Sequence, residues 1–226
     1  MDEQAEQTGR TIVVGDIHGC YDELIELLER VAVGANDRVV AVGDLIVKGE
    51  RNRDVLELFM SDARFSSVIG NHDLALLRYW RGDTLTLKPA QERARAELNA
   101  DWDRYAAYLG SLPAQIDLDT HLVVHAGIRP DVPLDEQAIE DLTELRTLGP
   151  DRTSRTGLPW YAMYNGPQTV LFGHWPAPQV RRAKFALGLD TGCVYGFQLT
   201  AYIIETGEFV QVQARRAYEQ PKRPVE

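Results

Sequence analysis

One pattern occurs three times in the first third of the sequence and narrows the fold to a small class. Each occurrence is a short apolar segment that ends in glycine and is followed at once by a side chain able to bind metal. The three are residues 11–15 before Asp16, residues 39–43 before Asp44, and residues 65–70 before Asn71. Apolar residues at helical spacing follow each one, which predicts a βαβαβα order with parallel strands and crossover helices. Because ligands bind beyond the carboxyl ends of such strands, we expect the three polar side chains along one edge of the sheet.

The remaining sequence predicts a single domain that carries an insertion. Residues 89–109 are rich in alanine, arginine and glutamate and are predicted to be helical. Further strands are predicted at 122–125 and 169–173, and the alternating residues 180–214 predict an antiparallel meander. The expected organisation is a disordered leader at 1–10, a domain at 11–216 with a helical insertion near 82–112, and a flexible tail at 217–226.

Charge and cysteine content limit the class of partner. The 226 residues carry a formal net charge of -10, so the overall field of the protein opposes bulk nucleic-acid binding. A phosphorylated substrate therefore needs local positive charge, which bound metal ions supply. Cys20 and Cys193 are far apart in the sequence and lack metal-type spacing, which argues against a disulfide framework or a thiolate zinc site. The polar first residues have no signal-peptide core, and no apolar run has the length of a membrane span, so we expect a cytoplasmic protein.

Histidines are concentrated at the predicted strand ends. Four of the five histidines, all except His121, stand there beside glycine, together with two aspartates and an asparagine. A single histidine of this kind is most often structural, but the joint pattern favours a metal site. Carboxylate, imidazole and amide ligands without thiolate suit manganese, iron or zinc. A carboxylate that bridges two ions about 4 Å apart would give the arrangement of two-metal phosphatases.

Five short motifs carry a resemblance to a known family. They are Gly15–Gly19 (GDIHG), Gly43-Asp44, Gly70–Asp73 (GNHD), His125–Gly127 (HAG) and Gly173-His174. In this order they resemble the PPP-type branch of the calcineurin-like metallophosphoesterases. Through the phrases GDIHGCYDELIELL, GNHDLALL, FGHW and LDTGCVYG, nearly the whole chain resembles bacterial symmetrical diadenosine tetraphosphatases and their shorter relatives. The resemblance implies an α/β fold of two stacked mixed β-sheets flanked by helices, with the metals at the strand ends.

The resemblance also implies roles for individual residues. The implied metal ligands are Asp16, His18 and Asp44 for one ion, and Asp44, Asn71, His125 and His174 for the other. Asp44 would bridge two divalent ions, which we expect to be manganese, with iron or zinc as alternatives. His72 matches the histidine that protonates the leaving oxygen. Lys48 matches a phosphate-binding position, and Arg51 follows it closely enough that we expect it to contact substrate as well.

The second motif departs from the pattern of protein phosphatases. Those enzymes usually have aspartate where Val47 stands and arginine where Lys48 stands. Valine accepts no hydrogen bond, so the group that orients His72 is either absent or supplied elsewhere, with Asp73 as a candidate. Lysine keeps the positive charge but cannot form the bidentate hydrogen bonds that arginine makes to phosphate. Both departures favour a tetraphosphatase-like enzyme.

The sequence therefore predicts a two-metal phosphohydrolase that cleaves phosphoanhydride bonds of dinucleoside polyphosphates or short polyphosphates with a metal-activated hydroxide. A protein serine/threonine phosphatase is the alternative, and phosphoproteins would then be its partners. A catalytically inactive metal-binding scaffold is a third hypothesis, which metal binding without turnover would reveal. No membrane partner is expected.

Overall fold

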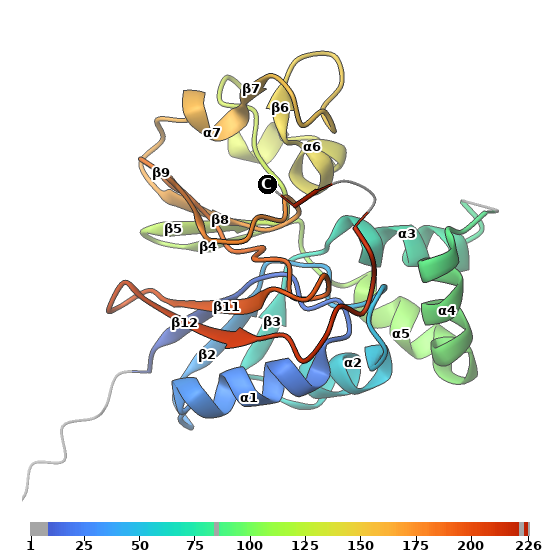
Figure 1. Cartoon of the computed structure of the whole chain (residues 1–226). Helices are drawn as coiled ribbons and strands as arrows, with labels where there is room; N and C mark the ends of the chain where they lie inside the picture. The colour runs from blue at the N-terminus through green and yellow to red at the C-terminus, as the bar shows by residue number, and fades with distance from the viewer. Residues whose placement is uncertain (1–8, 84–85, 222–223, 226) are drawn as a thin grey trace, which may run out of the picture.

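The protein is built from two stacked β-sheets with helices outside them (Figure 1). The computed structural model describes residues 9–83, 86–221 and 224–225. Most of the predicted leader (1–10) and part of the predicted tail (217–226) therefore lie outside the described residues. The layer between the sheets is formed by Val13, Val40, Val42, Val68, Val123, Leu171, Leu189 and Tyr202. The predicted α/β architecture of two stacked mixed sheets is confirmed.

The first sheet has the strand order β12-β11-β1-β2-β3. Its strands are β1 (Thr11–Val14), β2 (Arg38–Ala41), β3 (Phe65–Ser67), β11 (Gln198–Ile203) and β12 (Glu208–Gln213). Strands β1, β2 and β3 are parallel, as the sequence predicted, with Val13 opposite Val40. Burial on both faces explains the continuous apolar runs of β1 and β2. β11 pairs antiparallel with the other edge of β1, so β1 lies at the centre of the sheet.

The second sheet has the strand order β4-β5-β8-β10-β9. Its strands are β4 (Gln115–Leu118), β5 (His121–Val124), β8 (Thr169–Phe172), β9 (Arg181–Ala183) and β10 (Ala186–Gly188). Strands β5, β8 and β10 are parallel, whereas β4 and β9 are antiparallel edge strands. A separate two-stranded ladder is formed by β6 (Thr147–Leu148) and β7 (Leu158–Pro159).

The predicted antiparallel meander at 180–214 is wrong in its pairing. The segment forms two hairpins, β9-β10 and β11-β12, but the hairpins belong to different sheets. β10 lies parallel to β8, and β11 lies antiparallel to β1. Alternation of apolar and polar residues identifies strands but does not identify their partners, and here each hairpin extends a different sheet. The loop between them, residues 189–197, therefore crosses from one sheet to the other.

Helices flank the sheets (Figure 1). They are α1 (Tyr21–Val31), α2 (Asn52–Ser61), α3 (Asn71–Trp80), α4 (Pro89–Leu98), α5 (Trp102–Leu109), α6 (Ile139–Glu144) and α7 (Trp160–Met163), with 3₁₀ turns η1 (Asn99–Asp101) and η2 (Leu134–Glu136). α1 buries Leu24, Leu27 and Val31, the helical spacing seen in the sequence, and packs on β11 and β12. α4 and α5 lie in the segment predicted as an insertion and pack against α2 and α3. Among the described residues, no helix combines the length and the apolar character that crossing a membrane requires.

Asp37 fixes the connection between α1 and β2. Its carboxylate accepts hydrogen bonds from the backbone N–H groups of Arg10 and Gly34, both at 2.8 Å, and pairs with the Arg10 guanidinium at 2.6 Å. The hydrogen bonds from the Arg10 side chain are the main reason that the pKa of Asp37 falls to about 2. The folded protein therefore favours the ionised carboxylate.

Asp37→Asn should lower the free energy of unfolding at pH 7 by about 1–2 kcal/mol, because solvent screens the partly exposed Arg10 and reduces the value of the pair. An aspartate in the unfolded chain titrates near pH 4, so this stabilisation is present above about pH 4 and is lost as the pH falls toward 2. Urea unfolding at several pH values measures the difference, with Asp135→Asn, at an exposed position, as the control. A difference that stayed constant down to pH 2.5 would contradict the assignment.

Candidate active site

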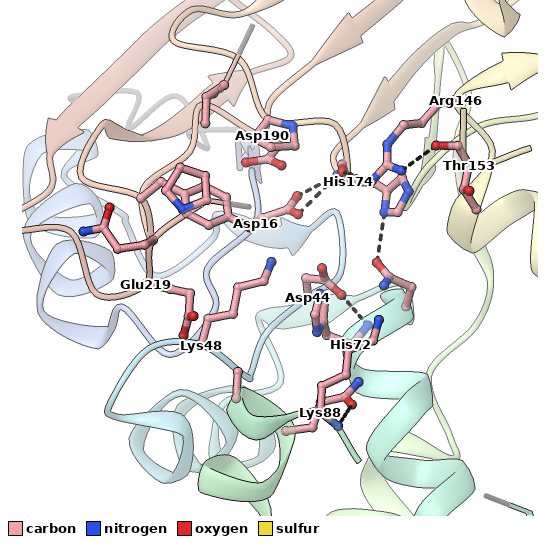
Figure 2. Close-up of a pocket in the computed structure, with 18 of the residues that line it drawn as sticks. Asp16, Asp44, Lys48, His72, Lys88, Arg146, Thr153, His174, Asp190 and Glu219 are labelled. Atoms are coloured by element: carbon pink, nitrogen blue, oxygen red, sulfur yellow. Dashed lines mark hydrogen bonds between the residues drawn. The ribbon is translucent and has the colours of Figure 1, made fainter. Parts of the chain in front are cut away.

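The carboxyl ends of strands from both sheets meet at one cavity of about 600 Å³ (Figure 2). In the first sheet, β1, β2 and β3 lead into Asp16, Asp44 and Asn71. In the second sheet, β5 and β8 lead into His125 and His174. The contacts below show that the structure brings together the residues predicted as metal ligands, which are Asp16, His18, Asp44, Asn71, His125 and His174.

Asp16, His18 and Asp44 form the first group of potential ligands. One ligand atom from each of the three buried side chains lies within 4.8 Å of the others. Nε2 of His18 is 3.4 Å from Oδ2 of Asp44 and 3.8 Å from Oδ2 of Asp16. Nδ1 of His18 lies 3.2 Å from the backbone oxygen of Ile46 and can donate to it. With Nδ1 as the donor, Nε2 carries the lone pair that can bind a cation between the two carboxylates, where Nζ of Lys48 lies 2.7 Å from it in this structure.

Asn71, His125 and His174 form the second group. Oδ1 of Asn71 lies 3.0 Å from Nε2 of His125 and 2.9 Å from Nδ1 of His174. Nδ1 of His125 lies 2.8 Å from the backbone oxygen of Val42, so its Nε2 is the nitrogen directed toward Asn71. The same Nε2 is 3.5 Å from Oδ2 of Asp44. Asp44 therefore contacts both groups, which is the position a bridging carboxylate needs.

Two glycines allow these side chains to approach one another. A Cβ atom on Gly70 would lie 2.2 Å from Oδ1 of Asp44, and a Cβ on Gly173 would lie 1.9 Å from Oδ1 of Asp16. No side chain fits at such distances. Glycine at these two motif positions is therefore required by the packing of the acidic side chains.

Four residues of the site adopt a left-handed backbone conformation. The φ angle is 50° at His18, 52° at Asp44, 75° at Lys48 and 64° at His174. This conformation is unfavourable for residues that have a Cβ atom, and it occurs preferentially at functional sites. The surrounding fold thus holds these residues in conformations that their local backbone preferences disfavour.

The carboxylates of the site form a buried group of like charge. Burial, followed by the nearby charge of Asp190, raises the pKa of Asp16 well above its usual range. Burial also raises the pKa of Asp44 to about 7, although Lys48 opposes the shift. A divalent ion between the carboxylates would relieve this repulsion, so the residues present fit a metal site.

The imidazoles of the site are neutral. Burial is the main cause that lowers the pKa of His18 and His174 well below the usual range, and it lowers the pKa of His125 to about 4. A neutral imidazole is the form that binds a metal ion. The protonation state of these side chains is therefore already suited to metal binding.

His72 borders the same cavity, and no described residue orients its ring through a hydrogen bond to Nδ1. Its backbone N–H donates to Oδ1 of Asp44 at 2.9 Å, and its ring packs edge-on against that of His18 at 5.2 Å. Nδ1 of His72 is buried without a hydrogen bond to any described residue. Asp73, the candidate partner, is wrong for this role, because its carboxylate accepts backbone N–H groups of Leu45, Ile46 and Gly70 at 3.1–3.3 Å. Its use in fixing the start of α3 leaves it unable to orient the imidazole.

The two residues predicted to bind substrate lie in different places. Lys48 lines the cavity, and its Nζ is 2.7 Å from Nε2 of His18. Arg51 is outside the cavity lining: its guanidinium pairs with Asp22 and Asp54 and lies over the ring of Tyr21 at 4.3 Å. These contacts hold Arg51 on the surface near α1, so the structure does not support the predicted contact with substrate.

Asp190 and Arg146 are among the cavity-lining residues that sequence reasoning did not identify as functional. Asp190 is buried, and the only signal for it was an acidic residue shortly after β10, as at the other strand ends. Arg146 donates to the backbone oxygens of Thr153 at 3.0 Å and His174 at 3.2 Å. Burial lowers its pKa to about 10. No motif surrounds Arg146 in the sequence, because the fold alone brings it to the cavity.

Comparison with known proteins identifies the family. The sequence model of the calcineurin-like phosphoesterases matches residues 9–203. Bis(5'-nucleosyl)-tetraphosphatase PrpE (asymmetrical) of Halalkalibacterium halodurans is 33% identical, with 90% of this chain and 94% of the relative covered. A symmetrical bis(5'-nucleosyl)-tetraphosphatase of Shigella dysenteriae is 30% identical, with 91% and 95% covered.

Solved structures agree with this result. A crystal structure provisionally described as a diadenosine tetraphosphatase matches with a TM-score of 0.79 at 33% identity, over 92% of this chain and 95% of that chain. A protein serine/threonine phosphatase of Saccharomyces cerevisiae matches with a TM-score of 0.67 at 15% identity, over 97% and 83%. The second match reflects the shared fold alone.

Proposed function

The chain belongs to the calcineurin-like phosphoesterase family and is a metal-dependent phosphoesterase, and on this premise we propose that it cleaves phosphoanhydride bonds of dinucleoside polyphosphates or short polyphosphates. The observation that carries the proposal is the convergence of both ligand groups on Asp44 inside a cavity that Lys48 and Arg146 also line. Relatives named as tetraphosphatases, which this chain matches over nearly their whole length, support the substrate class. The expected cytoplasmic location stays a prediction.

The proposed metal centre holds two divalent ions, manganese first among the candidates. The proposed ligands are Asp16, His18 and Asp44 for one ion, and Asp44, Asn71, His125 and His174 for the other. Bound there, the ions would supply Lewis-acid charge and lower the pKa of a water molecule for attack on phosphorus. The mixed oxygen and imidazole ligands suit manganese, iron or zinc better than they suit magnesium or calcium.

The other residues of the site bind substrate and move a proton. Lys48 and Arg146 would bind nonbridging phosphoryl oxygens, because both are cations that face the cavity. Burial also lowers the pKa of His72 well below its usual range in the free protein. Beside the anionic substrate His72 would be protonated, and it would donate this proton to the leaving oxygen as the bond to phosphorus breaks. Its Nδ1 has no described partner, so its orientation is set by packing against His18 and by the start of α3. A poorly oriented acid suits anhydrides, whose phosphate leaving groups need little protonation.

The alternative is a protein serine/threonine phosphatase, and the shared fold keeps this function as a rival. Val47 weighs against it, because the buried valine supplies no acceptor for His72 where such enzymes usually have aspartate. A serine alkoxide is a poor leaving group and depends on a well-oriented acid more than a phosphate does.

A substrate panel tests the proposal. The protein reconstituted with manganese, iron or zinc should hydrolyse diadenosine tetraphosphate or tripolyphosphate with a kcat/KM at least about tenfold above that for a phosphoserine peptide, a difference of about 1.4 kcal/mol. Val47→Asp combined with Lys48→Arg should raise the rate on the phosphoserine peptide and so reduce the ratio of the two kcat/KM values. Equal rates on the peptide and the anhydrides under the same metal conditions would contradict the proposal. Metal binding without any turnover would favour the hypothesis of a catalytically inactive scaffold.

A further inference from the structure

Four basic side chains line the cavity and form no ion pair with a described carboxylate. They are Lys48, Lys88, Arg146 and Arg155. In a chain with 34 acidic and 24 basic residues, unpaired bases that share a cavity are available for an external anion. Three acids of the cavity, Asp16, Asp44 and Asp190, belong to the buried carboxylate group, and the fourth, Glu219, is paired with Arg93. Beyond Lys48 and Arg146, the cavity therefore offers two bases, Lys88 and Arg155, that have no described carboxylate partner.

Lys88 differs from its basic neighbours in the same helical segment. It directly precedes α4, and its backbone N–H donates to Oε1 of Gln91 at 2.8 Å, which fixes the start of the helix. Arg95 on α4 is paired with Glu92 at 2.7 Å, and Arg93 is paired as well. Of these three bases, only Lys88 lines the cavity and has no described carboxylate partner.

The bases lie on different sides of the ligand groups. In the view of Figure 2, Lys88 and His72 lie on the same side of the cavity, whereas Arg146, which donates to the backbone oxygen of His174, lies on the opposite side. His72 is the proposed acid, so the leaving group must lie on its side of the scissile bond. A phosphate monoester brings one phosphoryl group, which Lys48 and Arg146 suffice to bind. Only a leaving group with a phosphate of its own brings a second anion toward Lys88.

We infer that Lys88 binds the phosphate of the leaving group and thereby favours phosphoanhydrides over phosphate monoesters. This inference rests on the proposed function and assigns part of the substrate choice to one side chain. Binding on the leaving side stabilises the charge that develops on the departing phosphate oxygens, so Lys88 acts in the transition state as well as in substrate binding. The segment that contains α4 thus contributes a specificity residue to a cavity otherwise built by strand ends.

The test compares two substrates that differ in the leaving group, tripolyphosphate and p-nitrophenyl phosphate, on metal-reconstituted protein. Lys88→Ala should lower kcat/KM for tripolyphosphate by about tenfold or more, the effect of losing one charge-assisted contact. The loss on p-nitrophenyl phosphate should be at least about fivefold smaller. Lys88→Arg should recover most of the tripolyphosphate rate. Arg95→Ala is the matched control, because it removes a base from α4 outside the cavity and should change neither rate.

The outcomes separate this inference from the proposed function. If the unmodified protein hydrolyses p-nitrophenyl phosphate but neither tripolyphosphate nor diadenosine tetraphosphate, the proposed function fails and the inference fails with it. The unmodified protein could instead cleave the anhydrides while Lys88→Ala lowers kcat/KM equally on both substrates or leaves both values unchanged. In that case only the role of Lys88 is overturned. Thermal unfolding of each variant shows whether a rate loss reflects lost folding.

Discussion

Asp44→Asn should lose bound metal and hydrolytic activity together, with a fall in kcat/KM on the order of 10³-fold or more. Asp44 is the residue that contacts both ligand groups, 3.4 Å from His18 and 3.5 Å from His125. The substitution removes the charge that would hold both ions, and each ion is worth several kcal/mol of transition-state stabilisation. Elemental analysis after gel filtration measures the metal, and assays on diadenosine tetraphosphate and p-nitrophenyl phosphate measure the activity.

The fold should survive this substitution, which makes the result interpretable. Asparagine tolerates the left-handed φ of 52° at this position, and its Oδ1 can still accept the backbone N–H of His72. Burial disfavours the charged carboxylate, so the metal-free variant should unfold at a temperature no lower than that of the metal-free parent protein. Two ions per chain and normal turnover in the variant would rule out the bridging role.

His72→Asn should retain the metal ions and lose roughly 10²–10⁴-fold in rate on substrates with poor leaving groups, the usual contribution of a general acid. The loss should shrink on p-nitrophenyl phosphate, because nitrophenolate departs without a proton. His72 donates its backbone N–H to Asp44 and packs its ring against that of His18, while its Nδ1 has no described hydrogen-bond partner that would compete with proton transfer. Steady-state kinetics on the two substrate classes measures the difference.

The matched control for His72 is His121→Asn. His121 is the one histidine outside the predicted strand-end set, and its Nδ1 lies 2.9 Å from the hydroxyl of Thr120 near the protein surface. This control should keep full activity. An equal loss on good and poor leaving groups in His72→Asn would argue that the residue positions substrate and does not supply a proton.

The proposed ligands could be found from the sequence because parallel strands place their carboxyl ends at one edge. Asp16, Asp44 and Asn71 each directly follow the glycine that ends a predicted strand segment, so sequence position determines spatial position. Val47, which is wholly buried in the apolar core, also indicated that the usual orienting group for His72 is missing at that position, but the sequence left open whether another residue replaces it. The positions of the proposed ligands could therefore be predicted from local sequence.

The remainder of the cavity could not be predicted from local sequence. Arg146, Lys88 and Asp190 come from a helix–strand connection, a helix start and a loop between hairpins, and only tertiary packing brings them together. Arg51 shows the converse, since its nearness to Lys48 in the sequence suggested a shared role, while Asp22 and Asp54 hold it elsewhere. The predicted pairing of the last four strands was wrong for a similar reason, because the alternation of apolar and polar residues identifies a strand but does not determine which strand it pairs with.

The central position of β1 has a consequence for how the protein is made. During synthesis β1 can pair with β2 as soon as residues 38–41 have emerged, but its other edge stays open until residues 198–203 leave the ribosome. An open strand edge invites pairing with other chains, and contacts between distant segments form slowly. The backbone N–H of Gly15, the residue before Asp16, donates to the oxygen of Thr200 at 2.9 Å and gains this partner only at that late stage. A nascent chain therefore passes through most of translation with one edge of β1 unpaired.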